Sequence, residues 1–256
     1  MLFDVLTIFP SLFVSPLEEG ILRKARQEGK IQVRLTDIRD FADDRHATTD
    51  DRPFGGGEGM VMKPEPLAAA LEKVRAGGNS GRVILLTPQG RRYSQAVARE
   101  LADETSLILI CGRYEGVDER FRAAFCDDEI SIGDYVLTGG ELAAMVVIDS
   151  VTRLLPGVLG CPDSADKDTF SRNLLKHPQY TRPRDFRGVQ VPEVLMNGNH
   201  AEIDGYRFLE AVRRTLARRP DLLSREEFTA QESRLLRKHG LLEAIAAVKA
   251  GRADDC

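Results

Sequence analysis

The sequence predicts an α/β protein built on a parallel sheet, followed by a small all-helical C-terminal domain. Short runs rich in Val, Ile and Leu alternate with helical patterns from residue 2 to residue 155. Strands joined through helices favour a parallel sheet with helices on its faces. Between residues 157 and 168 the periodicity gives way to Gly, Pro, Asp and Ser, which is typical of a linker. Beyond residue 200 only helical patterns follow.

In the first part of the chain, each apolar run bounded by turn residues is expected to form a strand. The expected strands are 2–9, 31–38, 83–87, 107–111 and 129–137. Helices are expected between and after them, at 17–27, 64–75, 94–104, 117–125 and 141–155.

Three helices are expected in the second part, at 200–217, 225–239 and 241–250. Ser224 and Glu227 have the spacing of a capping box before the second of them, and Gly240 follows its end. We therefore expect a sheet domain over 1–160, a linker over 161–175 and a helical domain over 176–256.

Charge differs between the two parts. Residues 1–160 hold 19 Lys and Arg against 25 Asp and Glu, whereas residues 161–256 hold 17 against 15, so the balance changes from −6 to +2. Five arginines lie within thirteen residues of the second part: Arg207, Arg213, Arg214, Arg218 and Arg219. On a helix, Arg207, Arg214 and Arg218 would share one face with the other two flanking it. This face is a candidate phosphate-binding surface, and a merely solvated helix surface is the alternative.

The composition excludes several classes of protein. With 42% hydrophobic and 30% charged residues, the chain is not disordered or of low complexity. No apolar run approaches the length of a membrane span, and the amino terminus has no basic segment or cleavage site of a leader. We therefore expect a cytoplasmic protein without membrane contact. The four Cys form no CxxC pair and the four His form no HExxH motif, so neither a disulfide framework nor a metal site is predicted.

Glycine-rich loops are expected at the carboxyl ends of the strands, where α/β sheets bind their ligands. They are residues 52–60, 87–90, 112–116 and 131–141. None contains the Gly-Lys-Ser/Thr of a P-loop or a complete GxGxxG. Glycines also allow the backbone to approach a ligand closely, which suits recognition of a nucleoside. Each loop taken alone could instead be a tight turn, but three after successive strands favour a shared pocket.

The reactive groups are carboxylates and arginines rather than a nucleophile. No GxSxG elbow or adjacent Cys and His occurs. Candidate groups are Glu115, Asp118, Asp134, Glu141, Arg153, Asp163, Asp166 and Asp168. An aspartate of the linker could reach a pocket between two domains, so the last three are of particular interest.

Several motifs together resemble the bacterial tRNA (guanine-N1)-methyltransferase family, TrmD. They include PFGGGEGMVMKPEPL, LLTPQGRRYSQ, LICGRYEGVDERF and EISIGDYVLTGGELAAM, in the family's order and spacing. The resemblance extends to about residue 240. It implies a SPOUT-type fold with a deep trefoil knot, S-adenosylmethionine as methyl donor, and an obligate homodimer with active sites shared between subunits. It also implies that the helical domain binds tRNA, and it suggests that Mg²⁺ helps the reaction.

The same resemblance assigns the site residues. Cofactor-binding positions are Leu86, Thr87, Pro88, Gly90, Gly112, Tyr114, Glu115, Gly116, Ser131, Ile132, Gly133, Asp134, Tyr135, Val136, Leu137, Gly139 and Gly140. Asp168 matches the catalytic aspartate and Arg153 its arginine partner. Guanine N1 must lose a proton as the methyl group arrives, so a carboxylate can serve as general base. A guanidinium near O6 can stabilise the charge that develops there.

The implied reaction is methylation of guanine N1 at tRNA position 37, next to the anticodon, when a guanine precedes it. Four positions depart from the family pattern: Glu58, Thr169, Lys176 and Tyr206. Lys176 stands where an acidic residue is common and bears on how the neighbouring guanine is read. Two alternatives follow, a SPOUT methyltransferase with another RNA target and a noncatalytic RNA-binding protein of the same fold.

Overall fold

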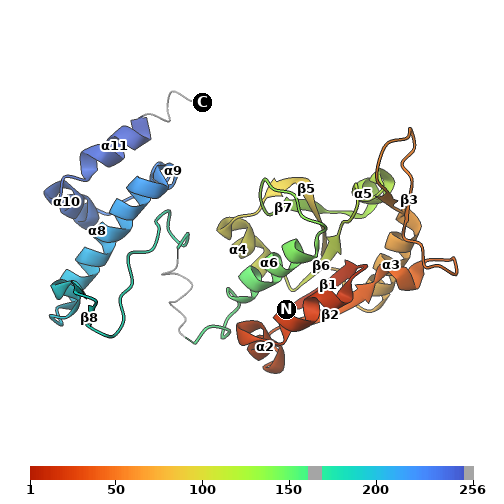
Figure 1. Cartoon of the computed structure of the whole chain (residues 1–256), viewed down its shortest axis with the longest axis horizontal. Coiled ribbons are helices and arrows are strands. Elements are labelled where there is room, and N and C mark those ends of the chain that lie inside the picture. The colour runs from red at the N-terminus through yellow and green to blue at the C-terminus, as the bar shows by residue number, and fades with distance from the viewer. Residues whose placement is uncertain (161–168, 251–256) are drawn as a thin grey trace. The chain divides into compact units, whose positions relative to one another are not determined.

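The computed structural model describes residues 1–160 and 169–250. The chain divides into two compact units, Met1–Pro162 and Asp163–Cys256. Each unit is described by itself below, and the elements of both are labelled in Figure 1.

The first unit is built on a five-stranded sheet in which every pairing is parallel. Its strands are β1 (Leu2–Thr7), β2 (Gln32–Asp37), β5 (Arg82–Arg92), β6 (Ser106–Cys111) and β7 (Asp128–Ser131), in the spatial order β2-β1-β6-β5-β7. The prediction of an α/β fold with a parallel sheet is confirmed. A separate two-stranded pair, β3 (Asp50–Asp51) with β4 (Val61–Met62), was not expected from the sequence.

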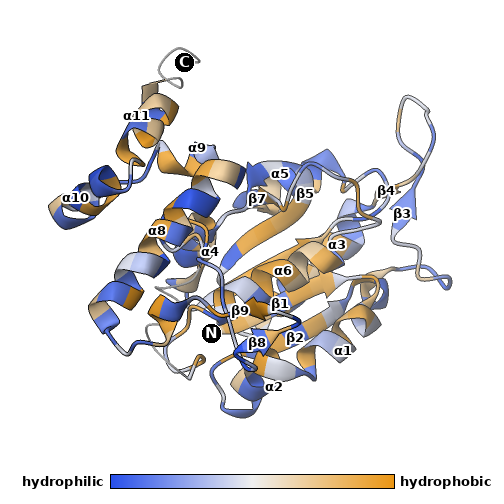
Figure 2. Ribbon diagram, turned by 60° about the vertical axis from the view of Figure 1, so that its left-hand side comes forward, coloured by the Kyte–Doolittle hydropathy of each residue, from blue (hydrophilic) through white to orange (hydrophobic). Residues whose placement is uncertain are grey.

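Helices cover both faces of this sheet. They are η1 (Pro10–Phe13), α1 (Val14–Leu17), α2 (Gly20–Gln27), η2 (Ile38–Phe41), α3 (Pro64–Ala76), α4 (Gln95–Ala102), α5 (Glu119–Phe125) and α6 (Glu141–Thr152). Successive strand residues point to opposite faces. Leu107 and Leu109 pack in a core with α2, α4 and α6, whereas Ile108 and Ile110 pack in a second core with α3 and α5. The neighbouring strands β1 and β6 inside the sheet are therefore apolar along most of their length, and Figure 2 shows hydrophobic colour in the sheet.

All five strands differ from their predicted bounds, and the two that differ most, β5 and β7, shape the cavity described below. β7 ends at Ser131 rather than at residue 137, because Gly133 has a positive φ of 149° that a strand does not continue through. β5 runs to Arg92, but Leu86 and Arg91 both pair with Ile130. Residues 87–90 therefore leave the ladder as a bulge.

The second unit contains four helices in its described part. They are α8 (His200–Arg218), α9 (Pro220–Leu223), α10 (Ala230–Lys238) and α11 (Leu242–Ala250). Their core includes Leu209, Val212, Leu223, Leu236 and Ile245. The unit is not entirely helical, because β8 (Asp185–Phe186) and β9 (Val189–Gln190) form a short antiparallel hairpin before the 3-10 turn η3 (Glu193–Leu195).

The predicted start of the helix at 225–239 is wrong. α10 begins at Ala230, and Thr229 with Glu232 forms the capping box in place of Ser224 with Glu227. The segment before it is held elsewhere, since Glu226 is buried and accepts hydrogen bonds from the Arg172 side chain and the Asn173 amide. Long-range pairing of this carboxylate takes precedence over the local helical pattern.

Candidate active site

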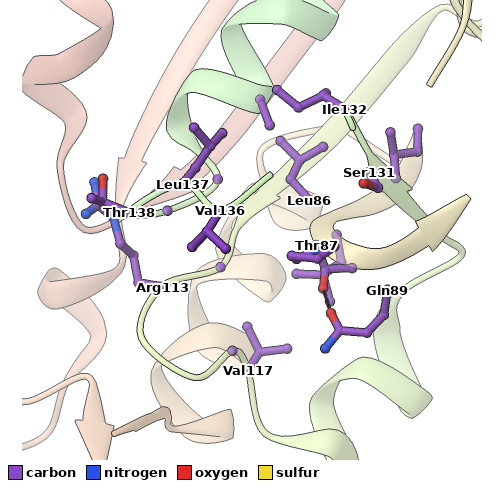
Figure 3. Close-up of a pocket in the computed structure, with 18 of the residues that line it drawn as sticks. Leu86, Thr87, Gln89, Arg113, Val117, Ser131, Ile132, Val136, Leu137 and Thr138 are labelled. Atoms are coloured by element: carbon purple, nitrogen blue, oxygen red, sulfur yellow. Dashed lines mark hydrogen bonds between the residues drawn. The ribbon is translucent and has the colours of Figure 1, made fainter. Parts of the chain in front are cut away.

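A cavity of about 210 Å³ lies where the bulge of β5 and the loops after β6 and β7 meet. Residues 86–89, 112–117 and 130–140 contribute to its wall, apart from Asp134. Figure 3 shows Leu86, Ile132, Val136 and Leu137 around this space, with Thr87 donating its hydroxyl hydrogen bond to Gln89 within the bulge. The candidate site thus lies at the carboxyl ends of neighbouring parallel strands.

Glycines let the second and third loops touch through their backbones. The Gly140 amide donates to the Gly112 carbonyl oxygen over 2.9 Å. A Cβ atom on Gly140 would lie 2.8 Å from Cys111 Cα and 3.1 Å from the Gly112 nitrogen, closer than a methyl group packs. The cavity wall here is made of main chain, and a side chain would push the two loops apart.

A buried ion pair joins the same loops. The carboxylate of Glu141, at the start of α6, is 2% exposed. Arg113 Nε donates to its Oε2 over 3.0 Å, and the Thr7 hydroxyl donates to its Oε1 over 2.8 Å. Arg113 also lies over the Phe9 ring, 4.4 Å from its centre. Because an unpaired buried carboxylate is costly, this network fixes the loop of Arg113 and the start of α6 to the end of β1.

The cavity holds no unpaired cation. Arg113 and Glu115 are the charged residues that line it, and Arg113 is neutralised by Glu141. A phosphate-bearing nucleotide would need basic side chains that are free to pair with its phosphates. The lining suits a neutral nucleoside held by main-chain groups and apolar side chains.

The thiols of Cys111 and Cys126 and the phenol of Tyr114 in the cavity wall are protonated at neutral pH. Burial raises the pKa of the Cys111 thiol well above its usual range and that of the Cys126 thiol to about 12. Partial burial, with Asp50 nearby, raises the pKa of Tyr114. Since the thiolate is the reactive form of cysteine, neither described cysteine is suited to nucleophilic catalysis.

Fifteen of the seventeen residues predicted to bind the cofactor line the cavity. Gly90 and Asp134 do not. A Cβ atom on Gly90 would lie 2.3 Å from Glu129 C and from Ile130 N, so this glycine allows β5 to pack closely against β7. Asp134 is exposed to solvent.

Sequence reasoning missed some lining residues: Leu85, Gln89, Arg113, Val117, Ile130, Thr138 and Ala143. Gln89, Arg113 and Thr138 stand inside the glycine-rich motifs themselves, so they could have been included. The sequence suggested Glu141 as a reactive carboxylate, but in the structure its oxygens accept hydrogen bonds from Arg113 and Thr7.

Neither of the two predicted catalytic residues is placed at the cavity by the described part of the chain. Asp168 lies outside the described residues, as do Asp163 and Asp166. Arg153 is half-buried and directly follows α6. The cavity lies at the other end of this helix, beside Gly140 and Ala143. Twelve residues of α6 separate the two ends by about 18 Å.

Within residues 1–160 and 169–250, no three His, Cys, Asp or Glu side chains are grouped as metal ligands. No helix in these ranges combines the length and apolar character needed to cross a membrane.

Comparison with known proteins agrees with the geometry of the cavity. The family model tRNA (Guanine-1)-methyltransferase TrmD matches residues 1–225. The chain is 58% identical over 236 residues to the tRNA (guanine-N(1)-)-methyltransferase of Geotalea uraniireducens (strain Rf4), covering 92% of this chain and 96% of that protein. It is 56% identical over 238 residues to the enzyme of the same name from Geobacillus kaustophilus (strain HTA426), covering 93% and 98%. The chain therefore belongs to the tRNA (guanine-1)-methyltransferase TrmD family.

Proposed function

We propose that this chain transfers the methyl group of S-adenosylmethionine to N1 of the guanine at tRNA position 37, when a guanine precedes it. A tRNA methyltransferase activity follows from family membership, and the position and its neighbour rest on the motifs of the sequence. The observation that carries the proposal is the cavity between the glycine loops, in which Gly140 packs closely against Cys111 and Gly112 and the lining Arg113 is paired with Glu141.

S-adenosylmethionine fits this cavity in its chemistry. It carries a nucleoside without phosphate groups and a positively charged sulfonium that supplies an electrophilic methyl group. Apolar side chains such as Leu86 and Leu137 can enclose the adenine, while the main chain of residues 132–137 offers hydrogen-bonding groups. The Glu115 carboxylate lies in the lining and is of the correct sign to favour the sulfonium.

In the proposed reaction, Asp168 accepts the proton of guanine N1 while Arg153 donates hydrogen bonds to O6. The new N1–CH₃ bond forms as the methyl–sulfur bond breaks, and the proton leaves on the carboxylate. The positive charge of the Arg153 guanidinium beside O6 stabilises the negative charge that develops on the guanine as its N1 proton leaves. No described group of side chains defines ligands for Mg²⁺, so its part in the reaction stays a prediction.

A homodimer with shared sites is part of the proposal. Arg153 and the cavity of the same chain lie at opposite ends of α6, so a second subunit is needed to bring such an arginine to the methyl group. α6 also carries an exposed apolar pair one turn apart, Leu142 and Val146, and packs beside η1, whose Leu12 is exposed as well. Contiguous exposed apolar side chains are typical of an interface.

A second proposed feature is a trefoil knot around the cofactor. It is supported by the return of residues 132–140 to the end of β6, where Gly140 contacts Cys111 and Gly112. We also expect the protein in the cytoplasm, where its tRNA substrate is made.

The proposed chemistry is tested by Asp168→Asn. The amide removes the base but keeps the size of the side chain, so methyl transfer to unmodified tRNA should fall about a hundredfold or more. Binding of S-adenosylmethionine, measured by calorimetry, should stay near the wild-type value. Equal single-turnover rates for variant and wild type would remove Asp168 from the mechanism.

Mapping the methylated base separates the proposal from its alternatives. A product other than 1-methylguanine at position 37 would indicate a different RNA target, for which Lys176 is the sequence feature. Binding of tRNA without any methyl transfer would indicate a noncatalytic protein.

The proposed dimer is tested by sedimentation of the wild-type chain at the concentrations used for the assay. Twice the mass of one chain is expected, and replacing both Leu142 and Val146 with Glu should lower both the mass and the rate. An active species with the mass of one chain would contradict the shared site.

A further inference from the structure

A second cavity, a cleft of about 440 Å³, lies entirely within the second unit. One wall is the segment from Thr169 to Gln179, and the other is the last two turns of α8. Thr169, Lys176, Arg214 and Arg218 contribute polar groups to it, and Leu175 contributes an apolar surface. Among residues 169–250, no carboxylate lines this cleft, whereas Lys176, Arg214 and Arg218 bring positive charge to it.

The two arginines of the cleft, Arg214 and Arg218, differ from the other arginines in α8 or directly after it. Arg213 pairs with Glu210 over 2.6 Å, Arg219 with Asp221 over 2.8 Å, and Arg207 with Asp204 over 3.7 Å. The acidic side chains next to these three arginines therefore offset their charge. In the part of the chain that the structure describes, no ion pair is formed by Arg214 or Arg218. They are one helical turn apart and so project to the same side of α8.

The facing wall is held firmly in place. The Leu175 amide donates to the Thr215 hydroxyl over 2.9 Å, and Thr215 is fully buried. Earlier in the segment, Arg172 donates hydrogen bonds to Glu226 and to Glu232, and Leu174 packs in the core of the unit. The segment is thus bonded to α8 at Thr215, which lies between Arg214 and Arg218 in the sequence. Both walls of the cleft are therefore held in place.

Hydroxyl and amide donors complete the set. The Lys176 amide donates to the Thr169 hydroxyl oxygen over 3.3 Å, which leaves the Thr169 O–H available as a donor into the cleft. Guanidinium groups bind phosphate through two parallel hydrogen bonds. Two of them one turn apart, together with the Thr169 hydroxyl, can surround a tetrahedral anion.

We propose that this cleft binds a backbone phosphate of the tRNA substrate through Arg214 and Arg218. The inference rests on the proposed function, because the tRNA supplies the polyanion. It refines the surface expected from the sequence: Arg207 is paired and does not line the cleft, so it is not part of the phosphate site. Phosphate contacts carry no base specificity and fix how the RNA lies on the protein.

Two charge-matched double variants of the full chain test the proposal. Arg214→Gln with Arg218→Gln removes the cleft cations, and Arg213→Gln with Arg219→Gln removes two paired cations beside them. The probe is unmodified tRNA, titrated over a series of salt concentrations. The cleft variant should bind roughly tenfold more weakly, with the logarithmic salt slope reduced by about one unit for one phosphate. The control variant should keep the wild-type slope.

Folding and charge are controlled separately. Calorimetric affinity for S-adenosylhomocysteine should be unchanged in both variants, which shows that the first unit is intact. Arg214→Lys with Arg218→Lys keeps the positive charge and should recover most of the slope. A cleft variant that fails to fold is replaced by the single Arg218→Gln, whose slope should lie between those of wild type and the double variant.

Equal losses in the two glutamine variants would overturn the proposal, because the effect would then be a general one of net charge. So would inorganic phosphate that binds the wild-type chain through Arg214 and Arg218 while their replacement leaves tRNA affinity unchanged, since the cleft would then take a free anion. If the wild-type chain does not bind tRNA, both the proposed function and the cleft fail. If wild type binds and methylates tRNA but the cleft variant matches it, the cleft alone fails.

Discussion

The two cavities described above are lined by different kinds of groups. In the first unit the wall is main chain at glycines together with apolar side chains, and the cation that lines it is bound to a buried carboxylate. In the second unit the wall carries two arginines without an ion pair to any described residue. A neutral nucleoside needs a fixed shape and directed hydrogen bonds, whereas a polyanion needs charge. The difference between the linings is what distinguishes the proposed cofactor site from the proposed phosphate site.

Other arginines of the first unit follow the same rule. Arg91 forms two hydrogen bonds of 2.8 Å with Glu100, and Arg82 pairs with Glu100 and Glu104. Paired charges of this kind contribute to the fold and attract little counter-charge from outside. The net balance of each unit is thus less informative than the pairing of each arginine.

The largest effect on the first cavity is expected from Gly140→Ala. The new methyl group would lie 2.8 Å from Cys111 Cα and force the two loops apart, at a cost of about 1–3 kcal/mol for overpacking. Affinity for S-adenosylhomocysteine should fall about ten- to hundredfold by calorimetry, while the salt slope of tRNA binding stays unchanged.

Gly160→Ala is the matched control for this variant, since a Cβ atom there meets nothing within 4 Å. Its cofactor affinity should equal that of wild type. Wild-type affinity in Gly140→Ala would show that close approach of the loops is not what forms the site. A reduced salt slope of tRNA binding in Gly140→Ala would show that the first cavity also contributes to phosphate binding.

The smallest effect is expected from Glu100→Gln, which tests the paired charges. Hydrogen bonds from Arg91 and Arg82 lower the pKa of Glu100 from 4.5 to about 2. Because the folded-state pKa is depressed, the stabilisation is complete above pH 4.5 and is lost as the pH falls towards 2. The side chain is 41% exposed, so the loss at neutral pH should be about 0.2–1 kcal/mol.

Thermal unfolding from pH 7 to pH 2 measures this effect. The Glu100→Gln variant should be less stable than wild type at pH 7 and converge with it near pH 2. Glu72→Gln, at an exposed glutamate of α3 without an ion pair among the described residues, should follow wild type throughout. Neither variant should change cofactor affinity or the salt slope, and a change in either would mean that paired surface charges also influence binding.

Much of the fold was predictable because the signal is local. Each of the five sheet strands was expected within a few residues of its observed start, because an apolar run or an apolar alternation marks it. The pairs that were missed are short, as with Asp50–Asp51 and Val61–Met62, where two residues give no periodicity. The capping box was misplaced because Ser224 and Glu227 satisfy the spacing locally, while burial of Glu226 with Arg172 holds that segment outside a helix.

The site was predictable to a similar extent and for a different reason. Family motifs identified most of the cavity lining, including Gly112 and Leu137. They could not show that Gly90 serves the packing of β5 on β7, because that depends on which strands are neighbours. Nor could they show that Arg113 is neutralised, because its partner Glu141 lies 28 residues away.

The sequence by itself determined the alternation of strands and helices, the glycine loops at strand ends and the family. These depend on short-range patterns and on the order of motifs along one chain. The tertiary structure alone decided which charges are free to bind. An arginine in a sequence always carries a positive charge, but whether a carboxylate cancels it depends on folding, as Arg213 and Arg214 show on adjacent positions of one helix. Pairing in space is a property of the folded chain, and here it distinguishes an arginine neutralised by a carboxylate from one that we propose to bind phosphate.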